Sequence, residues 1–385
     1  MTAHAKLRIT ALAGVLALVA GCGGGAAPVG GSTPTPLGSE DPDGPVLTVE
    51  PTVQTSGGAD MANPSPLPSP TTSREQKPRD LKSGVPTPAL TKHQQAADEA
   101  VRRGLTVWVE TDLVKHWLAG PQPYNEAIAK VKAMAERPGV AGVKIADELG
   151  YNDGMDSPRQ IKAFLAATAK ALRKAVPDTQ VMLDFYVPGL GCQPNSEHPK
   201  AKACREAADW KHPQISLGNM DHYLAGGYID VLNLSTAIQP EEVYKSWGSS
   251  RAETQKQAWT EVTARGWANY VTVHARRGLA HPGRFDGDKA RAKDLEEIFV
   301  GIPMDFGVAA TDIWTWRQAY KNDTYRLMDP GMKSNALWEA LRERRKSGAR
   351  LMTHFTPSSV EKSVPEDLAV LSTVFTDVLI AAGTG

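Results

Sequence analysis

The stretch that decides the fold is Val140–Tyr151, which reads VAGVKIADELGY. It follows a segment whose apolar residues have helical spacing. Its own apolar residues alternate with others, which predicts a strand that comes directly after a helix. Two acids, Asp147 and Glu148, stand where this strand ends. Acids at the C-terminal ends of parallel strands are typical of sites in α/β proteins, so the neighbouring segments need the same examination.

The residues on both sides of this stretch repeat the alternation of helix and strand. Apolar spacing predicts helices at 92–104, 124–139, 157–177, 241–266, 288–301 and 335–348. Runs rich in β-branched and aromatic residues predict strands at 105–111, 142–149, 179–187, 228–236, 269–276 and 307–316. Repeating units of this kind in one domain predict a parallel sheet.

We expect a TIM-like (β/α) barrel, and the pattern leaves open whether it is regular. A closed barrel needs eight strands, so two weaker strands would lie near 214–217 or after Arg350. A doubly wound open sheet is the alternative. No G-x-G-x-x-G or P-loop follows any predicted strand, so we expect no nucleotide binding.

The first 21 residues have the features of a secretory signal peptide. Lys6 and Arg8 precede the apolar run ALAGVLALVA, which is too short to span a bilayer permanently. The sequence VAGC at 19–22 resembles the lipobox of bacterial lipoproteins. That resemblance implies cleavage before Cys22, acylation there, and attachment to the extracytoplasmic face of the cell membrane. The alternative is an ordinary signal peptide with a chance cysteine.

Residues 22–90 are dominated by Gly, Pro, Ser and Thr and show no apolar periodicity. Such a segment buries too little apolar surface to offset its ordering entropy, so it predicts a disordered tether. The folded domain is expected at 91–350. Residues 351–385 form a C-terminal extension whose packing the sequence leaves open.

Charge and cysteine content exclude some functions. Lys and Arg number 43, as do Asp and Glu, and loss of the signal peptide leaves a slight acidic excess. This balance gives no support for nucleic-acid binding. Cys192 and Cys204 in an exported protein favour a disulfide. No H-x-H or H-E-x-x-H pair is present, so we predict no metal and no cofactor.

Alternation divides the side chains of each strand between the helices and the barrel interior. Because the apolar positions should face the helices, many polar side chains are expected inside, at or near C-terminal strand ends. Asp147 would face the helices or the rim. Burying several charges without a function is costly, so the interior set predicts a site. Its members are Trp108, Glu110, Lys144, Glu148, Asp184, Tyr186, Asn233, His274, Arg276, Asp312, Trp314 and Trp316.

Acids at strand ends, aromatic side chains beside them and export together resemble TIM-barrel glycoside hydrolases, over 91–348. The run KIADE at 144–148 is similar to the apolar run with a terminal Glu in that superfamily, with Asp147 where Asn is commoner. The resemblance implies hydrolysis by two carboxyl groups. Glu148 would be the general acid, and Asp184 or Glu110 would be the second carboxylate.

The carbohydrate would be bound by the remaining interior side chains. Two indoles at Trp314 and Trp316 suit stacking against a sugar ring. Polar side chains would bind hydroxyl groups or steady the acids. The expected binding residues are Trp108, Lys144, Tyr186, Asn233, His274, Arg276, Asp312, Trp314 and Trp316.

Three other functions fit the same residues. A divalent-metal hydrolase would use the acids with His274. A Schiff-base lyase would use Lys144, although an acid-rich interior would keep that lysine charged. A non-catalytic lipoprotein would bind glycans or capture solutes.

Overall fold

The computed structural model describes residues 91–151, 153–320 and 322–382. The signal peptide, Cys22 and the tether at 22–90 lie outside these residues, and what is predicted for them stays a prediction. Across the described ranges, no helix is both long enough and apolar enough to cross a membrane.

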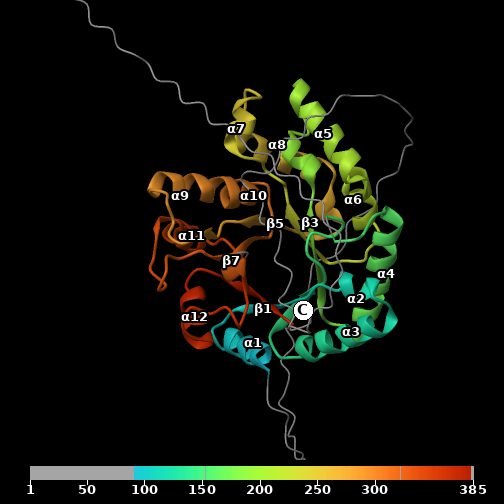
Figure 1. Ribbon diagram of the computed structural model, residues 1–385, viewed down its shortest axis with the longest axis vertical. Helices are drawn as coiled ribbons and strands as arrows, with labels where there is room; N and C mark the ends of the chain where they lie inside the picture. The colour runs from blue at the N-terminus through green and yellow to red at the C-terminus, as the bar shows by residue number, and fades with distance from the viewer. Residues whose placement is uncertain (1–90, 152, 321, 383–385) are drawn as a thin grey trace, which may run out of the picture. The chain divides into compact units, whose positions relative to one another are not determined.

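Eight parallel strands form a closed barrel surrounded by helices (Figure 1). Each strand pairs with the next along the chain, and the pairing of the last with the first closes the barrel. The TIM-like barrel predicted from the sequence is confirmed. In order, the strands are β1 (Thr106–Glu110), β2 (Val140–Lys144), β3 (Gln180–Tyr186), β4 (Val231–Ser235), β5 (Thr272–Gly278), β7 (Ala310–Tyr320), β9 (Leu351–Phe355) and β10 (Asp377–Ala381).

The helices alternate with these strands. The longer ones are α1 (Lys92–Arg102), α3 (Pro121–Ala135), α4 (Pro158–Ala175), α5 (Pro199–Lys211), α6 (Leu217–Leu224), α8 (Arg251–Ala264), α9 (Lys289–Glu296), α11 (Ala336–Lys346) and α12 (Val364–Leu371). Short helices are α2 (Val114–Leu118), α7 (Glu241–Lys245) and α10 (Ile302–Asp305). Local sequence signals set the ends of these helices. At the start of α4, the Ser157 hydroxyl accepts a hydrogen bond from the backbone N–H of Gln160, and Pro158 occupies the first turn.

Alternation along the strands separates two apolar clusters. Val107, Val109 and Val143 face outward and belong to the large core shared with the helices. A second, small cluster fills the lumen and consists of Trp108, Met182, Val231, Ala310, Met352 and Leu379. Polar side chains one pleat further along the strands lie at the C-terminal end of the lumen. The fold therefore places a polar layer on an apolar floor.

The C-terminal residues complete the barrel. The sequence leaves the packing of 351–385 open, and the structure draws β9, α12 and β10 from this region. Residues 213–215 form a single 3₁₀ turn before α6 instead of a strand. The last strand, DVLIA, is a short and nearly continuous apolar run, as expected of a strand covered on both faces.

Two features extend the C-terminal side of the barrel. Strand β7 continues as a hairpin with β8 (Asp323–Arg326), which also pairs with β6 (His281–Pro282). After β3, a 3₁₀ turn at Pro188–Cys192 is joined to α5 by the disulfide Cys192–Cys204, whose Cα atoms are 5.5 Å apart. The disulfide predicted from the two cysteines is confirmed.

Candidate functional site

A closed ring of six hydrogen-bonded side chains lies at the C-terminal end of the barrel lumen. We call it the lumen ring. Three carboxylates accept and three other side chains donate, in alternation around the ring. In order, its members are Glu110 (β1), Lys144 (β2), Asp184 (β3), Asn233 (β4), Asp312 (β7) and His354 (β9).

Lys144 is the most enclosed cation of the lumen ring. Its ammonium lies 2.6 Å from Glu110 and 2.9 Å from Asp184, and it also contacts Asp147. Burial alone would lower the pKa of Lys144, but the charges of Asp147, Asp184 and Glu110 outweigh it and raise this pKa well above its usual value. Lys144 is therefore a permanent cation rather than a nucleophilic amine.

Asn233 and His354 close the other half of the lumen ring. The Asn233 Nδ2 donates to Asp184 at 2.7 Å and to Asp312 at 2.6 Å. The two nitrogens of His354 face carboxylates, with Nε2 3.0 Å from Asp312 and Nδ1 2.8 Å from Glu110. Two carboxylate partners require both nitrogens to carry protons, so His354 is an imidazolium here.

Charges inside the lumen ring reinforce one another. Burial would lower the pKa of His354, but Asp312 and Glu110 raise it to about 10. Burial would likewise raise the pKa of Glu110, but His354 and Lys144 hold it far below its usual value. At neutral pH, Glu110 is therefore ionised and cannot act as a general acid.

Three more charged side chains are attached to the lumen ring. Asp147 contacts Lys144. Arg276 on β5 bridges Glu148 and Asp184, with Nη1 2.8 Å from Glu148 and Nε 3.1 Å from Asp184. The ring and its attachments thus contain five carboxylates and three cations.

The segment after β2 explains why both acids of the ADEL sequence reach this site. Strand β2 ends at Lys144, so alternation no longer applies beyond it. Glu148 has a left-handed backbone with φ 42°, which is uncommon outside glycine, and Gly150 follows with φ 82°. Alternation predicts that Asp147 faces the helices or the rim. It does not face the helices: Asp147 is partly exposed at the C-terminal end of the barrel and contacts Lys144, while the turn brings Glu148 to Arg276.

The two acids of this turn have raised pKa values. Burial is the main cause for Asp147, opposed by Lys144 and assisted by Glu110 and Asp184, and the pKa of Asp147 reaches about 7. Burial also raises the pKa of Glu148, although Arg276 lowers it. Asp147 therefore changes charge near neutral pH.

Aromatic side chains lie beside the lumen ring. The ring centroids of Tyr151 and Tyr186 are 4.5 Å apart, and His212 lies 4.7 Å from Tyr151. Tyr186 follows Asp184 by one pleat on β3, toward the C-terminal end. Its hydroxyl is close enough to Glu148 for the carboxylate charge to help raise the pKa of Tyr186, after burial.

Two of the predicted binding residues lie deeper in the lumen. Trp108 is buried in the apolar floor, and its Nε1 donates to Asp377 at 3.1 Å. His274 packs edge-on against Trp108, with ring centroids 6.4 Å apart. Burial and Arg350 lower the pKa of His274 to about 4, so it is neutral at physiological pH. Neither residue belongs to the lumen ring.

The predicted pair of lumen-facing indoles does not form. The Trp314 Nε1 donates to Gln318 at 3.1 Å, within the hairpin. Trp316 belongs to the outer core, where its Nε1 donates to Asp367 at 2.9 Å and its ring packs on Trp338. The pairing of β7 with β9 shifts between Ile313 and Arg317, so simple alternation fails over this part of β7.

Sequence reasoning missed His354. The run LMTHF lies in the C-terminal region left unassigned, although it has a strand-like composition and follows a predicted helix. Treating it as a seventh barrel strand would have placed a histidine beside the acids. Asp312, Asn233 and Asp184 were expected inside the barrel and do meet there.

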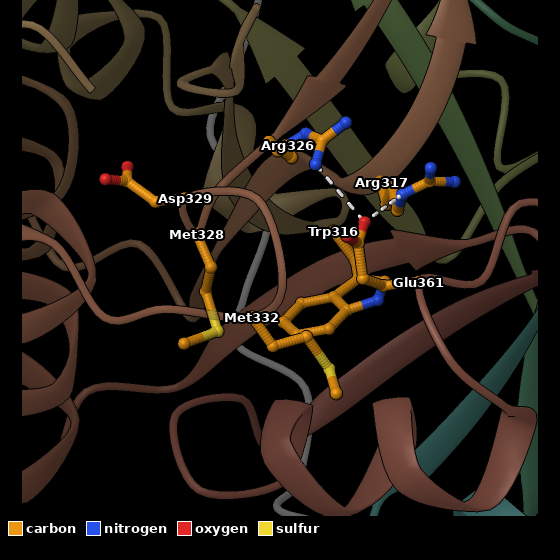
Figure 2. A pocket seen from close by; sticks show the side chains of 7 residues that line it. All are labelled: Trp316, Arg317, Arg326, Met328, Asp329, Met332 and Glu361. Carbon is orange, nitrogen blue, oxygen red and sulfur yellow. Dashed lines mark hydrogen bonds and ion pairs between the residues drawn. The ribbon is translucent and has the colours of Figure 1, made fainter. Parts of the chain in front are cut away.

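Two surface hollows lie among other residues. One is lined by Trp316, Arg317, Arg326, Met328, Asp329, Met332 and Glu361 (Figure 2). Both arginines in it reach Glu361, at 2.7 and 3.2 Å, so their charges are already engaged (Figure 2). The other lies between α9 and α11. Among the described residues, no group of three or more His, Cys, Asp or Glu side chains is arranged to hold a metal ion.

No protein family model matches the chain, and no curated protein matches it. Similar solved structures include the carboxyl transferase domain of Rhizobium etli pyruvate carboxylase with pyruvate, at 12% identity and a TM-score of 0.42. They also include a 2,3-dimethylmalate lyase of the PEP mutase/isocitrate lyase superfamily, at 11% identity and a TM-score of 0.34. The matches cover 75% of this chain and 42% of the first, and 76% of this chain and 80% of the second.

A third similar structure is the Rhizobium etli pyruvate carboxylase T882A with acetyl coenzyme-A, at 11% identity and a TM-score of 0.39. The match covers 76% of this chain and only 24% of that one, so this chain spans a minority of the length of that enzyme. Similarity at these levels indicates nothing about the reaction of this chain.

The glycoside hydrolase predicted from the sequence is wrong. The similar structures named above do not include a glycoside hydrolase. The correction rests on the geometry of the site. Glu148 is held by Arg276, and Glu110 and Asp184 are both held by Lys144, so each predicted catalytic acid is bound by a cation.

Proposed function

We propose that this protein is a lipid-anchored binding protein that holds a small polar solute, sugars among the candidates, at the C-terminal end of its barrel. The lumen ring carries the proposal. Six side chains from six strands are fixed there by hydrogen bonds, and buried polar groups held in one geometry are well suited to recognise a polar ligand.

The partial exposure of three residues supports this proposal. Glu110, Asp147 and Tyr186 are neither fully buried nor fully exposed, and they lie on or beside the lumen ring. Tyr151 packs on Tyr186 and adds an aromatic surface. Polar groups next to an aromatic face are a common arrangement for small ligands, in which the polar groups provide specificity.

Binding fits the charge state of the site better than Schiff-base catalysis. A lysine that forms a Schiff base must lose its proton, and three carboxylates around Lys144 oppose that loss. The ammonium is instead a fixed part of the ring. The anchor at Cys22 belongs to the proposal because of the VAGC sequence at 19–22.

Isothermal titration calorimetry against a panel of sugars, polyols and amines tests the proposal. The wild-type protein should bind at least one panel member, and Tyr186→Ala should weaken that binding without changing the circular dichroism spectrum. Tyr270→Ala is the matched control, because Tyr270 is an exposed tyrosine just before β5, at the end of the barrel opposite the ring. Turnover of the bound compound, or equal binding by Tyr186→Ala, would contradict the proposal.

A further inference from the structure

Two acids of the site reach solvent, and its other charged side chains are enclosed. Asp147 is 24% exposed and Glu110 is 16% exposed. The other acids, Asp184, Asp312 and Glu148, are 0%, 0% and 8% exposed. The cations are equally enclosed: Lys144 is 0%, His354 2% and Arg276 6% exposed. A ligand that approaches from solvent therefore meets carboxylate oxygens first.

The cations do not balance the acids. Five carboxylates share three cations, which leaves an excess of two negative charges when all groups are ionised. The ammonium of Lys144 forms ion pairs with three of these carboxylates, those of Glu110, Asp147 and Asp184. Excess negative charge in a partly enclosed site favours a cationic ligand, because that ligand replaces unfavourable repulsion by attraction.

The lumen ring is also short of hydrogen-bond donors. Two buried ring atoms lack a hydrogen-bond partner among the described residues, Asn233 Oδ1 and Asp312 Oδ1, and both are acceptors. Both side chains are fully buried. This observation is independent of the charge count, since an amide oxygen carries no charge, and it indicates an occupant that supplies donors.

We infer that the ligand of this site carries a protonated amine that lies against the carboxylates of Glu110 and Asp147. An ammonium group offers three donors and no acceptor, which matches the surplus negative charge at the accessible carboxylates. The Tyr151–Tyr186 pair provides an aromatic face on which the rest of the ligand, or the cation itself, can lie. This inference rests on the proposed binding function and specifies its ligand class.

Two matched pairs of probes test the inference. Putrescine is compared with 1,4-butanediol, in which hydroxyls replace both ammonium groups. A trans-aminocyclohexanol is compared with the corresponding cyclohexanediol, in which one hydroxyl replaces the one ammonium group. Titrations are run above the pKa of Asp147. We expect each amine to bind at least about tenfold more tightly than its diol, since hydrogen bonds to charged groups contribute about that much.

Two variants locate the effect. Asp147→Asn should weaken amine binding about tenfold more than it weakens diol binding. Asp178→Asn is the matched control: Asp178 is an exposed acid between α4 and β3, at the opposite end of the barrel. Asp178→Asn should leave the binding of amines and of diols unchanged. Glu110 is not substituted, because it belongs to the ring.

The outcomes separate this inference from the function on which it rests. Diols that bind as tightly as the amines would overturn the inference, while the binding function would stand. Amines that cause neither heat of binding nor a thermal shift at millimolar concentration would also overturn it, because an accessible excess of negative charge should hold them. If a sugar or polyol from the panel then binds, the proposed binding function would stand without the inference about an amine.

Discussion

His354 and Glu110 are hydrogen bonded at 2.8 Å, although 244 residues separate them along the chain. They stand on β9 and β1, and β10 lies between these strands in the barrel. The lumen-facing Leu379 of β10 is apolar and belongs to the floor, so the lumen ring passes over this strand. The hydrogen bond between His354 and Glu110 therefore completes the lumen ring, and with it the polar layer of the barrel.

This contact makes stability depend on pH. The folded pKa of His354 is raised to about 10, so its stabilising effect is complete below its ordinary pKa of about 6.5 and is lost as the pH rises toward 10. We expect His354→Gln to abolish the loss of stability that results from deprotonation of His354. Urea unfolding of the two proteins between neutral and alkaline pH measures it, and parallel curves would contradict the protonated state of His354.

Removal of Lys144 should be severely destabilising. Lys144→Met leaves three carboxylates without their shared cation, and breaking a buried ion pair in this way costs about 3–5 kcal/mol. Lys170→Met makes the same chemical change on the exposed side of α4 and should change the free energy of unfolding by less than about 0.5 kcal/mol. Equal stability of the two variants, measured by urea unfolding, would show that Lys144 is dispensable.

Much of the fold follows from sequence periodicity. Six strands and most of the helices between them were identifiable because their apolar positions repeat at strand or helix spacing, but α5 and α6 were not predicted. The last two strands were expected only as weak strands and stayed unassigned, because DVLIA lacks alternation. Parallel strands buried on both faces read as continuous apolar runs, which periodicity cannot separate from other buried segments.

The site was predictable only where residues lie within regular strands. Glu110, Lys144 and Asp184 meet because alternation and parallel pairing bring the ends of adjacent strands together. The contact of Asp147 with Lys144 was not predictable, because Asp147 follows the strand in a turn that contains the left-handed residue Glu148. Trp316 was misplaced because a register shift in β7 interrupts alternation. Such local departures have no periodic signal in the sequence.

The backbone of Glu148 should respond differently to glycine and alanine. Its φ of 42° lies in the left-handed region, which costs about 1 kcal/mol or more for a residue with a Cβ atom. Both Glu148→Gly and Glu148→Ala lose the ion pair with Arg276. We therefore expect the glycine variant to be about 1 kcal/mol more stable than the alanine variant. Thermal unfolding measures the difference, and the reverse order would contradict the turn geometry.

The proposed lipid anchor at Cys22 makes a separate prediction. Cys22 lies in the VAGC sequence, and acylation of its thiol requires the sulfur atom. Cys22→Ser should move the protein from the membrane fraction to the soluble fraction of cells, because the remaining chain shows no described helix that could span a bilayer. Cys204→Ser controls for loss of a cysteine elsewhere, and retention of Cys22→Ser in the membrane would contradict acylation.

Amine binding should depend on pH through Asp147. Its pKa is raised to about 7, first by burial, so it loses its negative charge as the pH falls through this value. Four charged groups face Asp147: Lys144, Glu110, Asp184 and Arg276.

Three of these groups keep their charges near pH 7. The pKa values of Lys144 and Arg276 are raised above their usual values, and the pKa of Glu110 is lowered below its usual value. The affinity for putrescine should therefore fall by about tenfold in total as the pH drops through 7, level off near the affinity of Asp147→Asn, and stay constant above this range. Titration calorimetry across this range measures the dependence. In Asp147→Asn the carboxylate is absent at every pH, so its weaker binding should lose this dependence; a variant that keeps the wild-type profile would assign the titration to another group.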